Sequence, residues 1–277
     1  SVGPLVSGIQ ALARGEQVHV PERGLLSEIA ASVNRTSDIL LSKNREIRRK
    51  DMARANWIAG VSHDIRTPLS MVMGYAAGME QEESIPPRFR KQAAAIRRQS
   101  QRMQNLINDL NLASKMEYSM QQVKTEPVNA VALLRKSVVD FINTDPEEKY
   151  PVEWETPEEL TACMVMGDRD LLSRAIFNLI QNCVNHNAQG CTIFAGVETR
   201  DGTCRIHIDD NGVGASPEEQ ERLARVPHYM VCDQNTREQR HGLGLLIVRQ
   251  IAMAHQGTVE IGSSIHGGFS VTIVLPL

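Results

Sequence analysis

The chain has 277 residues and a formal net charge of −3, from 30 Lys and Arg against 33 Asp and Glu. This length suffices for two or three small domains, and the near balance of charge argues against a nucleic-acid-binding protein, which needs a basic face. Aromatic residues make up only 4% of the chain, a composition that favours helical bundles over a β-sandwich. The five cysteines contain no C-x-x-C pair and indicate reduced thiols in a cytosolic protein.

Targeting signals are missing from the sequence. It has no signal peptide and no apolar run long enough to span a bilayer. Because it begins with Ser1 and not with Met, we expect it to be a piece of a longer protein.

Residues 1–43 predict a helix, an extended connector and a second helix. Apolar residues from Leu5 to Leu12 indicate a short amphipathic helix that Gly15 ends, and another helical pattern follows from Glu28. A generic amphipathic linker is the alternative for this segment.

Residues 44–120 predict a helical hairpin in which apolar residues recur every seven positions, a period typical of a bundle seam. The two rows are Ile58, Ile65, Val72 and Met79, and Phe89, Ile96, Met103 and Leu110. Pro68 is expected to kink the first helix, which should end near Glu80, and the second should run to about Tyr118. Since two such helices have too little core to stand alone, we expect two copies to form a four-helix bundle.

A linker at residues 121–127 precedes a change of period. Residues 128–277 mix helices and strands, which predicts a two-layer α/β sandwich. The expected elements are a helix at 131–141, strands at 152–154 and 164–166, a helix at 168–185, strands at 192–198 and 204–209, a helix at 242–254, and strands at 258–262 and 269–275.

The most informative segment is the octapeptide at residues 62–69. His63, Asp64 and Thr67 offer a nucleophile, a proton acceptor and a water-positioning hydroxyl within little more than one helical turn. With Ile58 at the first heptad position, His63 falls on the outer face, and Thr67 lies four residues further along that face. The alternative is an ordinary surface histidine.

Polar and Gly-rich motifs fill the last third of the chain. They are Asn178 to Asn182 with Asn185 and His186, Asp209 to Gly214, His241 to Leu245, and Gly267 to Thr272. Amide oxygens suit Mg²⁺, and a carboxylate can accept a hydrogen bond from an amine of a base. Glycines let the backbone approach a ligand, and the free N–H groups at a helix start favour phosphate.

The order of these motifs after the histidine segment resembles the sensor histidine kinases of bacterial two-component systems, over nearly the whole chain. The resemblance implies an ATP-dependent kinase that phosphorylates His63 and then an aspartate on the receiver domain of a response regulator. It implies ATP and Mg²⁺ as cofactors, with Asn182 as the metal ligand and Asp210 as the adenine-recognising group. Its H-[ED]-x-x-T pattern, met by Asp64 and Thr67, implies a regulator phosphatase as well.

The resemblance also implies a nucleotide-binding set. Its members are Asn178, Asn182, Asn185, Asp210, Gly212, Gly214, Arg237, Arg240, His241, Gly242, Leu243, Gly244, Leu245 and Thr272. The segment at residues 215–241 is expected to be a mobile lid.

The resemblance extends to the N-terminal segment, which is similar to a truncated HAMP relay module. It implies a homodimer, no nucleic-acid partner, and the cytoplasmic portion of a bacterial inner-membrane protein. The membrane spans and the sensor would then lie in a missing N-terminal part.

Several residues depart from the family pattern. Asn185 stands where Lys or Arg is usual, Gln181 replaces an acidic residue, and the lid has Pro227 to Met230 where a Phe pair is usual. These differences bear on nucleotide affinity and lid contacts, and Arg237 or Arg240 could supply the missing charge. The alternatives are a conformational ATPase with the same α/β fold, against which Gln181 argues, and a degenerate signalling relay.

Overall fold

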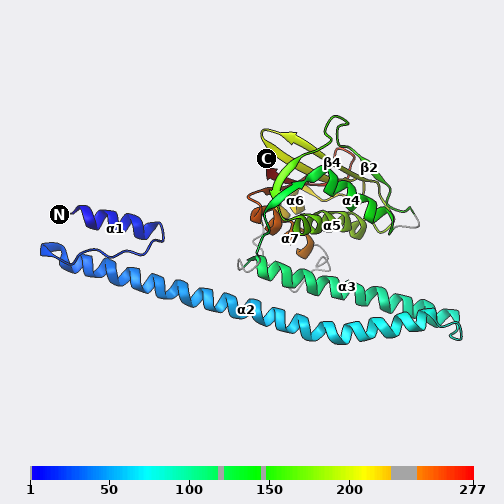
Figure 1. Ribbon diagram of the computed structural model, residues 1–277, viewed down its shortest axis with the longest axis horizontal. Coiled ribbons are helices and arrows are strands. Elements are labelled where there is room, and N and C mark those ends of the chain that lie inside the picture. The colour runs from blue at the N-terminus through cyan, green and yellow to red at the C-terminus, as the bar shows by residue number, and fades with distance from the viewer. Residues whose placement is uncertain (1, 118–121, 145–147, 226–241) are drawn as a thin grey trace. The chain divides into compact units, whose positions relative to one another are not determined.

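The computed structural model describes residues 2–117, 122–144, 148–225 and 242–277, and divides into two compact units at residues 61 and 62 (Figure 1). In chain order its elements are α1 (Gly3–Ala13), the 3₁₀ helix η1 (Gly24–Leu26), α2 (Ser27–Gln81), α3 (Pro87–Glu117), β1 (Glu126–Asn129), α4 (Ala130–Ile142), β2 (Val152–Trp154), β3 (Met164–Gly167), α5 (Arg169–His186), β4 (Ile193–Arg200), β5 (Thr203–Asp210), α6 (Pro217–Arg225), α7 (Gly242–Ala254), β6 (Thr258–Ser263) and β7 (Phe269–Pro276). Among these described helices, none combines the length and apolarity needed to cross a membrane.

In the first unit, the side chain of Asn34 holds the extended connector between α1 and α2. Its Oδ1 accepts from the Val20 N–H at 2.7 Å and its Nδ2 donates to the Val20 carbonyl at 2.9 Å. Both backbone groups of a buried residue are thereby satisfied, as a neighbouring strand would satisfy them. A small core of Leu5, Val20, Ala30 and Val33 forms beside this contact. The predicted order of helix, connector and helix is confirmed.

The predicted helical hairpin is formed by the C-terminal part of α2 and by α3. The first arm ends at Gln81, one residue beyond the predicted end, and Pro68 lies inside the helix without interrupting it. Because Pro68 has no N–H, the carbonyl of Asp64 lacks its helical donor at this point. On α3, Arg97 Nε donates to Glu80 Oε2 of α2 at 2.6 Å and ties the two arms together.

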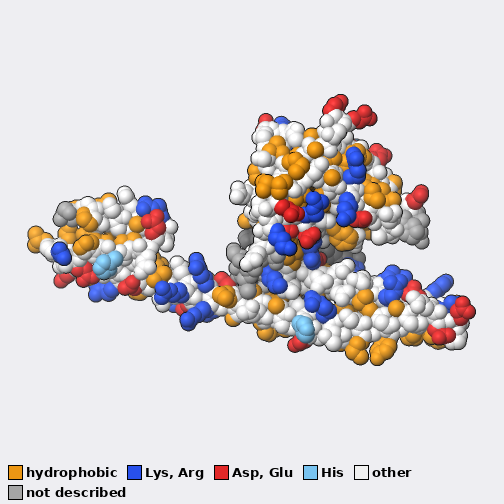
Figure 2. All heavy atoms as spheres, in the orientation of Figure 1, with side chains coloured by type: hydrophobic (Ala, Val, Ile, Leu, Met, Phe, Trp, Pro, Cys, Tyr) orange, Lys and Arg blue, Asp and Glu red, His pale blue; other side chains and the backbone are white. Residues whose placement is uncertain are grey.

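Large apolar side chains of the hairpin remain exposed in the single chain. Ile65, Val72 and Ile96 are 43%, 43% and 48% exposed, and Figure 2 shows hydrophobic side chains on the surface of the hairpin. Small residues such as Ala76 and Ala93 are buried instead. The heptad seam is therefore not consumed within the hairpin and is left for another surface.

The second half of the chain is the predicted two-layer α/β sandwich. A five-stranded sheet has the order β2-β4-β5-β7-β6, in which β2 and β4 are parallel and the other pairs are antiparallel. Helices α4, α5 and α7 cover one face of this sheet (Figure 1). The core between the layers includes Ile206 and Ile273 from the strands and Ile176 and Ile247 from the helices, all 0% exposed.

Two elements of this half of the chain were not predicted, and neither was the short η1 in the first unit. Strand β1 begins at Glu126, inside the expected linker, and pairs antiparallel with β3. Its four residues include Pro127, so they give little alternation to recognise. Helix α6 occupies the first part of the expected lid, where Leu223 is one of few apolar residues to mark a face. The remainder of that segment lies outside the described residues.

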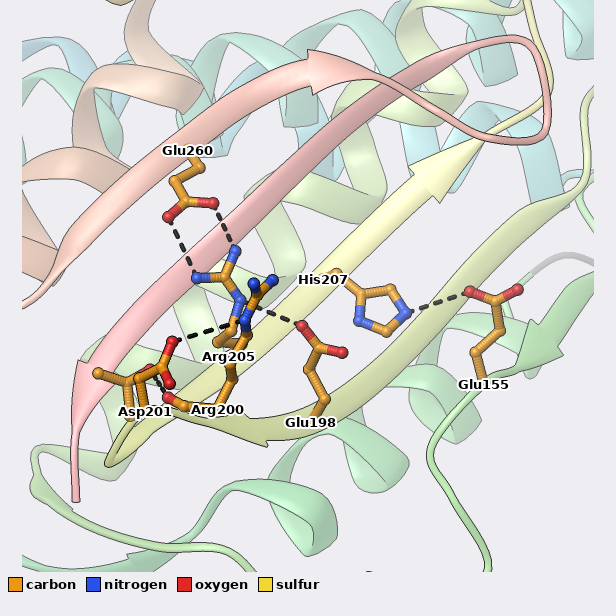
Figure 3. Close-up of polar contacts among 8 residues, drawn as sticks. Glu155, Glu198, Arg200, Asp201, Arg205, His207 and Glu260 are labelled. Carbon is orange, nitrogen blue, oxygen red and sulfur yellow. Dashed lines mark hydrogen bonds and ion pairs between the residues drawn. The ribbon is translucent and has the colours of Figure 1, made fainter.

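Charged side chains connect strands on the opposite face of the sheet (Figure 3). Arg205 of β5 donates to Glu198 of β4 at 3.1 Å and to Glu260 of β6 at 3.1 Å. His207 of β5 meets Glu155, which follows β2, with 3.2 Å between Nε2 and Oε2. These bridges connect β4, β5, β6 and the segment after β2 on a face that no described helix covers.

Asp168 fixes the start of α5, the helix that carries the predicted amide motif. Its Oδ1 accepts from the N–H groups of Asp170 and Leu171 at 3.0 and 3.1 Å, and its Oδ2 from the N–H of Lys124 at 3.0 Å. Burial opposes ionisation of this carboxyl, but the three N–H donors outweigh burial and hold its pKa below the ordinary value.

We therefore predict that Asp168→Ala lowers the free energy of unfolding by about 1–2 kcal/mol, as expected for loss of a helix N-cap. Because the folded-state pKa is depressed, the difference from wild type should be present above about pH 4 and disappear as pH falls through the folded-state pKa. Urea denaturation at several pH values measures this, with the exposed Asp170→Ala as control. A loss that stays constant down to pH 2 would contradict the assignment.

Candidate nucleotide pocket and phosphoacceptor histidine

His63 lies on the surface of α2, as its predicted outer-face position requires. The side chains of His63 and Asp64 are 76% and 84% exposed, and His63 Nδ1 lies 3.3 Å from Asp64 Oδ1. When the neutral ring carries its hydrogen on Nδ1 and donates it to Asp64, the lone pair of Nε2 is available for attack. Thr67 is also exposed, one turn further along. The three predicted residues are thus accessible together.

A separate pocket opens among α5, α6, α7 and the ends of β5 and β7. It encloses about 620 Å³, including the solvent at its mouth. Its apolar wall includes Leu179, Ile208, Leu245, Phe269 and Val271. Polar groups are few, and two of them, Asn182 and Asp210, were predicted from the sequence. Apolar walls with a few convergent polar groups are the usual form of a small-molecule site.

Asp210 is the buried carboxylate of this pocket and is only 3% exposed. Its Oδ1 accepts from the N–H of Gly212 at 2.8 Å and from the N–H of Phe269 at 3.3 Å. One donor belongs to the loop after β5 and the other to the first residue of β7, so one carboxylate oxygen fixes both segments. Burial, and next the negative charge of the nearby Asp210, raise the pKa of the Cys183 thiol. Cys183 is therefore a neutral neighbour.

Two glycines allow the loops to meet at Asp210. A Cβ at Gly268 would lie 2.2 Å from Asp210 Oδ1 and 2.3 Å from the Asp210 carbonyl oxygen, which is too close for any other residue. Gly214 has a φ of +64°, which glycine adopts without strain. The fold therefore requires glycine at positions 214 and 268 of the Gly-rich motifs.

Asn182 faces the start of α7. A Cβ at Gly244 would come within 3.2 Å of Asn182 Oδ1, so the amide approaches the first turn of that helix closely. Gly242 is the first residue of α7 and Leu245 lines the pocket. The N–H groups of such a first turn have no partners within the helix and suit an anion.

Other predicted residues fall at the edge of the pocket or away from it. Asn178 is 7% exposed and its Nδ2 has no hydrogen-bond partner among the described residues, whereas Asn185 is exposed. Neither belongs to the lining residues, and Leu243 is half-buried at the start of α7.

Thr272 lies on the opposite face of β7 from the pocket. It alternates with the lining residue Val271 and pairs in register with His207 and Glu260. The period of two along a strand therefore directs its hydroxyl to the other side of the sheet. Arg237, Arg240 and His241 lie outside the described residues.

Sequence reasoning missed several lining residues. Asn187 follows α5 and is 4% exposed, and Glu219 and Leu223 come from the unpredicted α6. An Asn directly after a helical pattern is a recognised end signal, but nothing in the sequence linked Asn187 to Gly212. Phe269 follows the Gly267-Gly268 pair, and this glycine pair is the sequence signal that could have identified Phe269 as a lining residue.

Other groups in the described residues carry no cofactor signal. No cluster of three His, Cys, Asp or Glu side chains within them could hold a metal ion. Cys163, Cys183, Cys191 and Cys204 are free thiols.

Two protein families match the chain. The model of the His Kinase A (phospho-acceptor) domain matches residues 53–119. The model of the histidine kinase-, DNA gyrase B- and HSP90-like ATPases matches residues 167–277. The first range contains His63 and the hairpin, and the second contains the pocket.

Curated relatives are similar over most of the chain. Sensor histidine kinase YvrG of Bacillus subtilis is 27% identical over 89% of this chain and 42% of its own length. Signal transduction histidine-protein kinase BaeS of Escherichia coli is 27% identical over 99% of this chain and 56% of its own length. The chain thus spans about half the length of these relatives.

A solved structure shares the fold. That of full-length ShkA in complex with AMPPNP has a TM-score of 0.61 at 22% identity, covering 80% of this chain and 45% of the other.

We predict that Asp210→Asn weakens binding of a fluorescent ATP analogue about tenfold or more. The Asn oxygen can still accept from Gly212, but the site loses a charged acceptor, a change worth about 1.5–3 kcal/mol. The matched control is Asp209→Asn, because Asp209 is the buried neighbour on the opposite face of β5 and burial raises its pKa. If the two variants weaken binding equally, Asp210 does not contact the nucleotide.

Proposed function

The chain belongs to the sensor histidine kinases of two-component systems, and from this premise we propose that it uses ATP to phosphorylate His63. One observation supports this proposal: the same chain contains an exposed His63–Asp64 pair and a pocket lined by the buried carboxylate of Asp210. The nucleophile can be reached from outside, while the pocket offers apolar walls and a buried carboxylate to an adenine ring.

The pocket suits adenine and phosphate chemically. Its apolar wall suits a flat heterocycle, and Asp210 can accept a hydrogen bond from the exocyclic amine of adenine. The first turn of α7, from Gly242 to Leu245, offers N–H donors to the phosphates. We assign these contacts to ATP as the substrate.

Asn182 would be the protein ligand of Mg²⁺. Magnesium binds few protein groups and completes its shell with water and phosphate oxygens, which fits a single amide oxygen beside the first turn of α7. When bound, the ion supplies neutralisation of phosphate charge. Asn178, Asn185, Arg237, Arg240 and His241 remain proposed contributors, whereas we leave Thr272 out because of its orientation.

In the proposed reaction a ring nitrogen of His63 attacks the γ-phosphorus in line. A nitrogen–phosphorus bond forms, the bond from phosphorus to the β,γ-bridging oxygen breaks, and ADP leaves. Asp64 accepts the hydrogen bond of the other ring nitrogen, so it orients the imidazole and stabilises the positive charge that develops.

The proposed phosphoryl acceptor is an aspartate on the receiver domain of a response regulator. His63 is exposed enough for another protein to reach it. Thr67 has no base strength near neutral pH, so its proposed role is to position the water that removes phosphate from the regulator. The chain would then act as kinase and as phosphatase.

We propose a homodimer through the hairpin. The row containing Ile65 and Val72 on α2 and the row containing Ile96 on α3 are exposed in one chain. Pairing with a second copy would bury both rows in a four-helix bundle.

The proposed cellular setting is the cytoplasmic side of a bacterial inner membrane. The helix, connector and helix of residues 1–43 would relay a signal to the hairpin as a HAMP module does. Asn34, which binds the connector to α2, would keep that relay in register.

The function is tested by His63→Gln, which we predict abolishes acid-labile, base-stable ³²P labelling from γ-labelled ATP. Binding of the ATP analogue should stay within about twofold of wild type, because the pocket contains no residue of the octapeptide. The control is Thr67→Ala, on the same helix face, which should keep its labelling. If His63→Gln is still labelled, His63 is not the nucleophile. ATP hydrolysis by wild type without any labelling would favour the conformational ATPase.

A further inference from the structure

Asn187 occupies the space where any other residue at position 212 would place its side chain. A Cβ at Gly212 would lie 1.8 Å from Asn187 Oδ1, 2.2 Å from its Cγ and 2.5 Å from its Nδ2. These are the three nearest atoms, and all belong to one carboxamide. Gly212 has no positive φ, so backbone conformation does not explain the glycine.

The carboxamide of Asn187 is fixed on both sides. Its Oδ1 accepts from the N–H of Val213 at 2.9 Å, and its Nδ2 donates to the carbonyl of Cys183 at 2.8 Å. Only this orientation places an acceptor before the N–H and a donor before the carbonyl. Asn187 is 4% exposed, so each of these groups would be costly to leave unpaired.

The backbone of Asn187 is held as well. It is the residue after the last turn of α5, with φ −116° and ψ 65°, and its carbonyl accepts from the Tyr150 hydroxyl at 3.1 Å. Its carboxamide therefore extends from a fixed helix end to the loop that follows Asp210.

That loop is the one on which the pocket depends. The N–H of Gly212 donates to Asp210 Oδ1 at 2.8 Å, and the neighbouring N–H of Val213 donates to Asn187. Gly212 and Val213 are consecutive residues, so Asp210 and Asn187 hold two successive N–H groups of the same loop. Asn187 thus connects this loop to the end of α5, where its Nδ2 donates to the Cys183 carbonyl.

We propose that Asn187 is a positioning residue for the nucleotide pocket, and that position 212 is glycine because the Asn187 carboxamide fills the space of its Cβ. The inference rests on the proposed function for the identity of the ligand. It differs from the expectation that Gly212 is glycine to admit the nucleotide, and the two explanations make opposite predictions for a double variant.

The experiment compares Gly212→Ala, Asn187→Ala and the double variant in the whole chain. Two quantities are measured for each: the thermal midpoint without nucleotide, and the dissociation constant of a fluorescent ATP analogue. Gly262→Ala is the control, because a Cβ there meets nothing within 4 Å.

We expect Gly212→Ala to lower the midpoint and to weaken binding at least tenfold in the wild-type background. In the Asn187→Ala background the same change should alter binding by less than about twofold, because the carboxamide that it strikes is gone. Asn187→Ala alone should weaken binding about tenfold, as for one buried N–H left without an acceptor. It should also raise the KM for ATP in autophosphorylation while kcat stays near wild type. If Gly212→Ala fails to fold, folding of the double variant supports the steric explanation.

Two results would overturn the proposal. If Gly212→Ala weakens binding and lowers the midpoint equally in both backgrounds, position 212 is glycine for a reason other than the Asn187 carboxamide. If Asn187→Ala lowers the midpoint but leaves binding and KM unchanged, the residue is only structural. Failure of wild type to bind the ATP analogue would instead refute the proposed function, and the midpoints would still test the steric explanation.

Discussion

The buried carboxylate of Asp210 is the interaction on which the pocket depends. One of its oxygens accepts from the N–H groups of Gly212 and Phe269, so a single side chain joins the loop after β5 to the start of β7. A buried charge of this kind is tolerated only when donors surround it. The glycine at 268 follows from this requirement, because a side chain there would displace the carboxylate. The glycine at position 268 is therefore a consequence of placing a charged acceptor in an apolar site.

The hairpin meets a different requirement of the proposed reaction, which is that the nucleophile must stay accessible. His63 stays exposed because it belongs to neither the small buried residues nor the apolar rows of the hairpin. Burial of small residues such as Ala93 leaves Ile65 and Ile96 at the surface, where a second copy can cover them. In the proposed reaction ATP must be brought to His63, since the pocket contains none of the octapeptide. The proposal therefore gives the accessible histidine and the buried adenine to different parts of the chain.

The sequence predicted the features that repeat and missed those that depend on distant contacts. The sequence pattern placed α7 and β2 at their observed bounds. Helix α7 buries Ile247 and Ile251 along one face, and β2 alternates half-buried Val152 and Trp154 with exposed Glu153. It could not find β1, whose pairing with β3 is non-local, or α6, which is short and highly charged. Asp210 and Asn182 were predicted from the family resemblance, and both line the pocket. Thr272 was assigned to the site from resemblance alone, and strand alternation directs it elsewhere. Asn187 escaped notice because its partners, Gly212 and Val213, lie some 25 residues away.

The most direct test of the account changes the ligand and leaves the protein intact. Inosine triphosphate differs from ATP at the position that Asp210 is assigned to recognise, where a carbonyl oxygen replaces the exocyclic amine. A carboxylate that accepts from the amine would face another acceptor, so competition binding should show ATP at least about tenfold tighter. Equal affinities for the two nucleotides would contradict the claim that Asp210 reads the base.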